Sequence, residues 1–174
     1  MTDQLDLALF VLRVAAGLMI FAHGYAHVRK NGKSAIEGTA AWFGSMGMRP
    51  AVAQAWLASV TELGAGVMLV VGLLTPLAAA GLFGVVFVAL LIAHRTNGFF
   101  IYNKGQGWEY VAMLMVVAAV IGTLGAGTWS LDHALDVTWF SAWRGLLAVI
   151  LGGGGGALVL LATCWRPPSS ASTS

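Results

Sequence analysis

The chain has 174 residues, of which 59% are hydrophobic and only 9% are charged, whereas soluble domains average about 25% charged residues. A chain this apolar cannot cover its surface with polar groups in water, so its solvent must be lipid. The net charge of +2 does not indicate a nucleic-acid partner. The single cysteine, Cys164, excludes an intrachain disulfide, a CxxC redox pair and CxxCH haem attachment.

The apolar residues are grouped in stretches long enough to cross a bilayer, which takes about 20 residues per helix. Barrel strands would be shorter and would alternate in polarity. The sequence therefore predicts an all-α integral membrane protein with five transmembrane helices, which fall at residues 5–28, 52–74, 77–95, 109–126 and 143–164.

The first and second helices each carry one charge at a similar predicted depth. Arg13 lies about 12 Å from one end of its helix and Glu62 about 15 Å from the same side of the membrane, at 1.5 Å per residue. Because an unpaired charge at mid-bilayer costs several kcal/mol, we expect Arg13 and Glu62 to form a buried ion pair. The pair would either lock the two helices together or form a proton or ligand site.

The connections between these helices carry further signals. The segment 38–48 is short and aromatic and follows a basic run, which is typical of an interfacial helix. Thr75 and Pro76 suit the N-cap and the first position of a helix, so residues 52–74 and 77–95 should form a tight antiparallel hairpin.

Lysine and arginine are concentrated on one predicted side of the membrane. That side holds loop 29–51, loop 96–108 and the C-terminal tail, and we call it the basic side. The positive-inside rule places it in the cytoplasm, so the N-terminus is expected on the outer side of the membrane. Its cations are Arg29, Lys30, Lys33, Arg49, Arg95, Lys104 and Arg166, against Arg144 alone on the other side.

Near the basic side, polar groups of three helices should lie at one level. His23 and His27 are one turn apart on the first helix, and His94 and Glu109 flank loop 96–108. Three histidines and a carboxylate could bind a metal, two histidines could ligate a b-type haem, and a histidine with a carboxylate could hold a quinone headgroup and relay its protons. Alternatively, these groups hydrogen-bond only one another. The candidate ligand or proton site comprises His23, His27, His94, Arg95, Asn97, Trp108, Glu109 and Tyr110.

The C-terminal part of the chain differs in composition from the rest. The predicted helix 143–164 contains five consecutive glycines at 152–156, which permit close helix contact in lipid and indicate a packing face. Residues 165–174 are polar and are predicted to be a disordered tail.

Several motifs in a fixed order resemble the DoxX family of small bacterial membrane proteins. The similarity covers residues 8–135 and includes "LRVAAGLMIFAHG", "VTELGAGVML", "LLTPLAAAGL", "AHRTNGFF", "GWEYVAMLMV" and "SLDHAL". The resemblance implies a four-helix transmembrane domain over residues 1–142, to which 143–164 adds a fifth helix. It also implies a link to redox complexes of the quinone, sulfur or oxidative-stress type.

The first hypothesis is therefore an integral-membrane subunit of a redox-associated complex, with a polar site at the mouth of the bundle. A quinone is the first candidate for its ligand, ahead of haem or a metal at His23, His27 and His94. Whether the chain is itself catalytic stays open. The glycine-rich fifth helix would dock a protein partner or a second copy. A structural or assembly subunit is the alternative, and a small transporter is disfavoured because the chain shows no inverted repeat.

Overall fold

A computed structural model describes residues 3–29, 35–137 and 142–168, and the regular elements of this part of the chain are all helices, with no strand. Lys30, Lys33 and the predicted tail beyond Pro168 lie outside the described residues. The elements in chain order are α1 (Asp3–Val28), α2 (Ala35–Ser45), α3 (Ala51–Val71), α4 (Thr75–Ala89), η1 (Leu90–His94), α5 (Glu109–Leu124), α6 (Leu131–Ala134), α7 (Trp143–Leu147), η2 (Ala148–Gly155) and α8 (Gly156–Cys164).

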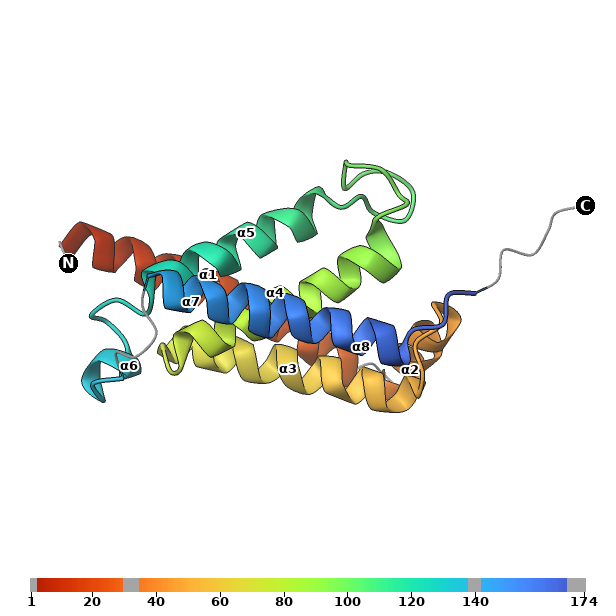
Figure 1. Cartoon of the computed structure of the whole chain (residues 1–174), viewed down its shortest axis with the longest axis horizontal. Coiled ribbons are helices and arrows are strands. Elements are labelled where there is room, and N and C mark those ends of the chain that lie inside the picture. Colours follow the sequence, from red (N-terminus) through yellow and green to blue (C-terminus); the bar gives the residue numbers. More distant parts are fainter. Residues whose placement is uncertain (1–2, 30–34, 138–141, 169–174) are drawn as a thin grey trace, which may run out of the picture.

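The prediction of an all-α membrane protein is confirmed. Four continuous helices in the described residues are long and apolar enough to cross a membrane, and α5 is a shorter apolar helix of 16 residues. Two of the four contain π-helical turns, η1 at the end of α4 and η2 between α7 and α8. Figure 1 shows α2, loop 96–108 and the end of α8 at one end of the molecule, and the start of α1, the α3–α4 turn and α6 at the other.

Glycines set the contact between α1 and α3. A Cβ atom on Gly17 would lie 2.8 Å from the carbonyl oxygen of Gly66, and one on Gly24 would lie 2.9 Å from Cβ of Glu62. Such close backbone approach is how membrane helices gain packing energy without a hydrophobic driving force. The contacts fix a register in which Gly24 is level with Glu62 and Gly17 with Gly66.

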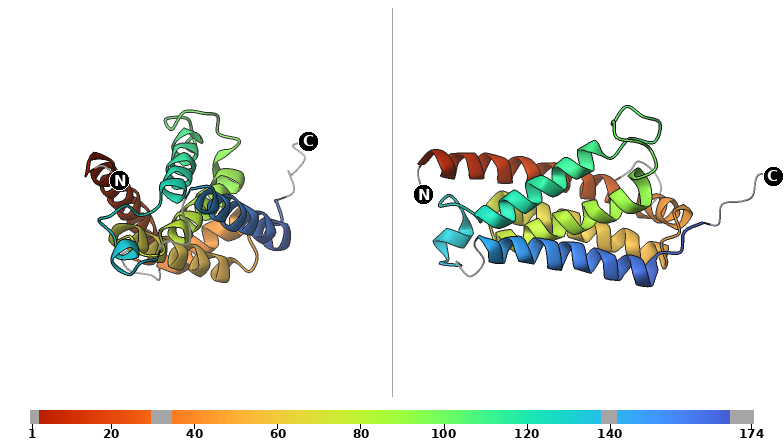
Figure 2. Two further views of the ribbon diagram at one scale, coloured as in Figure 1. Left: turned by 60° about the vertical axis from the view of Figure 1, so that its left-hand side comes forward. Right: turned by 45° about the horizontal axis from the view of Figure 1, so that its top comes forward.

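The C-terminal helix packs on α4 through its glycines. A Cβ atom on Gly153 would lie 2.4 Å from the carbonyl oxygen of Ala80, and one on Gly84 would lie 2.9 Å from that of Gly153. The glycine run predicted to dock a partner therefore makes its close contact within the chain. Figure 2 shows α1 and the C-terminal helix on opposite sides of the pair formed by α3 and α4.

The start of the predicted tail is held against the segment after α2. Trp165 pairs with Met48 in an isolated antiparallel bridge, and its indole nitrogen donates to the carbonyl oxygen of Met46 at 2.8 Å. The backbone nitrogen of Arg166 donates to Gly47 at the same distance. These two residues, which the sequence placed in a disordered tail, instead fasten the end of α8 to the basic side of the bundle.

Candidate functional site

An open groove of about 1570 Å³ runs along the bundle, with α4 as its floor. On α3 it is lined by Thr61, Glu62 and Gly64, and on the C-terminal helix by glycines and small apolar residues. Near the basic side it reaches His23, His27 and Tyr110. The lining is mostly apolar with a few convergent polar groups, which is the usual character of a small-molecule site.

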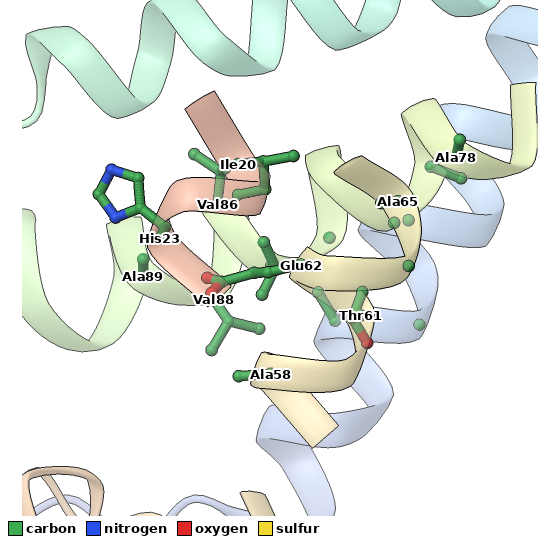
Figure 3. A pocket seen from close by; sticks show the side chains of 18 of the residues that line it. Ile20, His23, Ala58, Thr61, Glu62, Ala65, Ala78, Val86, Val88 and Ala89 are labelled. Atoms are coloured by element: carbon green, nitrogen blue, oxygen red, sulfur yellow. The ribbon is translucent and has the colours of Figure 1, made fainter. Parts of the chain in front are cut away.

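Glu62 is the acidic group at the centre of this groove. It is the twelfth of the 21 residues of α3 and is 8% exposed. Figure 3 shows its side chain extending from α3 towards α1 and α4. Oε2 of Glu62 lies 3.3 Å from Nε2 of His27, yet this oxygen is buried and accepts no well-formed hydrogen bond from the described residues. The carboxylate therefore has unused hydrogen-bonding capacity inside the membrane.

His23 and Tyr110 form a second polar pair at the edge of the groove. The hydroxyl of Tyr110 lies 3.3 Å from Nε2 of His23, and the two rings are stacked with centroids 6.2 Å apart. His23 comes from α1 and Tyr110 from α5, so the pair joins two helices whose sequence positions are far apart. The structure thus brings together four of the residues considered from the sequence: His23, His27, Glu62 and Tyr110.

The predicted Arg13–Glu62 ion pair is wrong, because each residue has other partners. Arg13 is fully buried and donates to the carbonyl oxygens of Leu69 at 2.9 Å and Trp129 at 2.6 Å. It lies eleven residues before Gly24 on α1, about 16 Å along the axis at 1.5 Å per residue, and Gly24 is level with Glu62. The prediction assumed that α1 and α3 end in one plane, whereas their glycine contacts shift α3 towards the basic side.

Asp132 is a structural neighbour of Arg13 that the sequence did not place there. Its carboxylate accepts hydrogen bonds from the backbone nitrogens of Leu74 at 2.6 Å and Thr75 at 2.8 Å, at the start of α4. Its own backbone nitrogen donates to Gly72, against which Arg13 also lies. The available signal was the "SLD" motif, because serine before a helix and an acidic residue in its first turn are typical of helix starts.

The remaining candidates organise loop 96–108 rather than a shared polar layer. Nδ1 of His94 lies 2.9 Å from the carbonyl oxygen of Gln106, and Nδ2 of Asn97 donates to Gly105 at 2.7 Å. Oε1 of Glu109 accepts from the backbone nitrogen of Ile101 at 2.8 Å. Trp108 packs edge-on against Phe99, and Arg95 stacks over Trp165. The expectation that Glu109 contacts His23 is therefore wrong, because the Glu109 carboxylate binds the backbone of the loop instead.

The metal alternative has no ligand set in the described residues. No three side chains of histidine, cysteine, aspartate or glutamate come together there in a way that could hold an ion. His23 contacts Tyr110, His27 contacts Glu62, and His94 contacts the loop backbone, so the three histidines serve separate places.

We expect Glu109→Ala to loosen loop 96–108. The change removes the acceptor for Ile101, a charge-assisted hydrogen bond that contributes about 1.5 kcal/mol or more. Limited proteolysis in detergent should show several-fold faster cleavage between residues 96 and 108. Glu109→Gln, which keeps an acceptor oxygen, should cleave almost as slowly as the native chain; equal acceleration in both variants would contradict the capping role.

Comparison with known proteins adds one finding. The model of the DoxX family matches residues 8–95, which is 88 of the 174 residues. The match includes Arg13, His23, His27, Glu62 and His94, and it ends before loop 96–108, α5 and the C-terminal helix. No curated protein and no solved structure gives a significant match to the chain.

Proposed function

The chain belongs to the DoxX family and is a multi-pass membrane protein, and from this premise we propose that it is a subunit of a redox-associated membrane complex that binds a quinone-type molecule in its groove. The observation that carries the proposal is the buried, incompletely bonded carboxylate of Glu62 inside a mostly apolar groove. Buried polar groups are normally satisfied, and an exception in a cavity points to an absent partner.

The chemistry of the groove suits a molecule with a carbonyl headgroup and an apolar body. Tyr110 and the two histidines can donate hydrogen bonds to carbonyl oxygens, and Glu62 with His27 can exchange protons with a headgroup between them. No lysine or arginine lines the groove in the described part of the chain. A phosphate or carboxylate ligand would meet the charge of Glu62 without a permanent cation to offset it, so a neutral ligand is favoured.

The orientation of the protein in the membrane is part of the same proposal. We place loops 29–51 and 96–108 and the C-terminus in the cytoplasm of a bacterium, because these segments carry most of the lysine and arginine residues. Headgroup chemistry at His23, His27 and Tyr110 would then take place in the half of the membrane nearer the cytoplasm. A protein partner would approach the exposed aromatic loop 96–108, which includes Tyr102 at 78% exposure.

Glu62→Gln is expected to weaken the binding of decylubiquinone, a short-chain quinone, by about tenfold in Kd. The substitution keeps the shape of the side chain but removes its charge and its capacity to exchange a proton, and a hydrogen bond to a charged group contributes about 1.5–3 kcal/mol. Binding is measured by titration of the purified protein in lipid nanodiscs. Tyr110→Phe should weaken it less, by about threefold to tenfold, through loss of one neutral hydrogen bond.

Glu37→Gln is the matched control, because it is the same substitution at an exposed position of α2, outside the groove. It should leave Kd unchanged. Mass spectrometry of solvent extracts from protein purified in mild detergent provides a second measurement, and the native chain should retain a quinone that Glu62→Gln loses. Native protein that carries no quinone and does not bind decylubiquinone would overturn the proposal and leave a structural role.

A further inference from the structure

We infer that His27 and Glu62 hold one proton between them, and that Thr39 fixes a hydrogen on Nδ1 of His27. The pair would thus be a proton-binding site between α1 and α3, and α2 would orient the His27 ring through Thr39. The inference assigns a role to Thr39, which does not line the groove proposed above as the quinone-type site.

The hydrogen-bond donors around His27 decide where its protons are. Nδ1 of His27 lies 3.3 Å from Oγ1 of Thr39. The single hydroxyl hydrogen of Thr39 has nearby carbonyl acceptors, Ala35 at 3.1 Å and His27 itself at 3.4 Å. A threonine hydroxyl within a helix usually donates to the carbonyl four residues earlier, as it does here to Ala35. Oγ1 then faces Nδ1 as an acceptor, so Nδ1 must carry a hydrogen.

The other side of the His27 ring faces a carboxylate oxygen. A neutral imidazole has only one N–H, and with that hydrogen on Nδ1, Nε2 is a bare acceptor. Nε2 nevertheless lies 3.3 Å from Oε2 of Glu62. Two lone pairs at this distance repel each other unless a proton lies between them. Either His27 is protonated on both nitrogens beside a Glu62 carboxylate, or Glu62 is a neutral acid.

Among the residues that the structure describes, no lysine or arginine forms a salt bridge with Glu62. Tyr110 from α5 and His23 from α1 are the titratable neighbours on the groove side, and they contact each other. Thr39 from α2 is neutral, and α4 contributes only apolar residues such as Val88 and Ala89 where Figure 3 shows it beside Glu62. A lone carboxylate buried within the bilayer would be costly, and a proton shared with His27 removes most of that cost.

The path from this site leads towards the basic side. Glu62 is inside the groove, His27 is in the last turn of α1 and is partly exposed, and Thr39 is on α2. His27 therefore exchanges the shared proton at Nε2, which faces Glu62, because Nδ1 already carries the hydrogen that is donated to Thr39. Delivery of this proton to a bound headgroup rests on the proposed function, whereas the shared proton itself does not.

The experiment therefore uses ligand-free protein in nanodiscs, with nitrogen-15 in its histidines and carbon-13 in its glutamates. At about pH 8, where an ordinary histidine with a pKa near 6.5 is neutral, we expect one of two results. His27 shows two protonated ring nitrogens, or Glu62 shows the infrared carbonyl band of a protonated acid. Signals are assigned by loss in His27→Gln and Glu62→Gln.

Three variants distinguish the proton shared by His27 and Glu62 from the hydrogen bond between His27 and Thr39. Glu62→Gln should return His27 to a neutral ring with hydrogen on Nδ1. Thr39→Val should remove that preference for Nδ1, while Thr39→Ser, which keeps the hydroxyl, should not. A neutral His27 beside an ionised Glu62 in the native chain would overturn the inference, even if decylubiquinone binds. Intact sharing with no quinone binding would overturn only the proposed function.

Discussion

Arg13→Met is expected to lower the free energy of unfolding by about 3–5 kcal/mol, because it removes a fully buried charge that holds two separate segments together. Arg13 donates to Leu69 at the end of α3 and to Trp129 in the segment after α5. Methionine fills much of the volume but leaves both carbonyl oxygens without this donor. The change is measured by reversible unfolding in mixed micelles and by the loss in Tm.

Arg49→Met is the matched control, since Arg49 is exposed, and it should shift the free energy of unfolding by less than about 0.5 kcal/mol.

Double-mutant cycles test whether Arg13 is coupled to Glu62 or to Asp132. Arg13→Met and Glu62→Gln should be additive within about 0.5 kcal/mol, because the two sites share no partner. Arg13→Met and Asp132→Asn, which both touch the α3–α4 turn, should not be additive. Strong coupling of Arg13 to Glu62 would restore the ion pair and contradict the structure.

Gly153→Ala is expected to destabilise the chain by about 2 kcal/mol, although alanine is the better helix former. Its Cβ atom would lie 2.4 Å from the carbonyl oxygen of Ala80. This is a backbone atom, so a change of side-chain rotamer cannot relieve the clash. The C-terminal helix would have to move away from α4. The same unfolding assay measures the effect, and cysteine crosslinking between the two helices reports the separation.

Gly155→Ala, two residues away in the same run, is the control. A Cβ atom there meets no heavy atom of the described chain within 4 Å, so the substitution should be neutral or stabilise the helix by up to about 1 kcal/mol. Equal destabilisation by both variants would mean that the glycine run acts through backbone flexibility. The docking role that the sequence suggested for the run would instead require Gly155→Ala to weaken association with a partner.

Most of the fold could be predicted because lipid leaves few choices. Backbone polar groups in a membrane must be satisfied within a helix or a closed barrel, so long apolar stretches such as 5–28 and 143–164 already specify helices. The observed spans, Asp3–Val28 and Trp143–Cys164, differ from these ranges by two residues or fewer at each end. The start of α4 near Thr75 and Pro76 was also expected, but Thr75 is the first helical residue and not the N-cap, and the carboxylate of Asp132 accepts the hydrogen bonds that a capping side chain would have taken.

The site was harder to predict, because it depends on how far one helix slides past its neighbour. Depth counted from helix ends placed Arg13 beside Glu62, and the Gly17–Gly66 and Gly24–Glu62 contacts move them apart. Single glycines in apolar helices give no sign of which residue they will face. Loop 96–108 was misread for a related reason: its polar residues satisfy the loop's own backbone, as Asn97 and Glu109 do, and composition cannot distinguish that use from ligand binding.

The depth of Glu62 in the membrane has an electrical consequence. Glu62 is level with Gly24, which lies four residues before the end of α1 on the basic side, or about 6 Å at 1.5 Å per residue. This is about a fifth of a hydrocarbon core that is about 30 Å thick, so a proton that reaches Glu62 from the basic side crosses about a fifth of the transmembrane voltage. One charge crossing the whole membrane at 100 mV exchanges about 2.3 kcal/mol with the field, so a fifth of that distance corresponds to about 0.5 kcal/mol. The proton occupancy of His27 and Glu62 would thus respond roughly twofold to the energised state of the cell membrane.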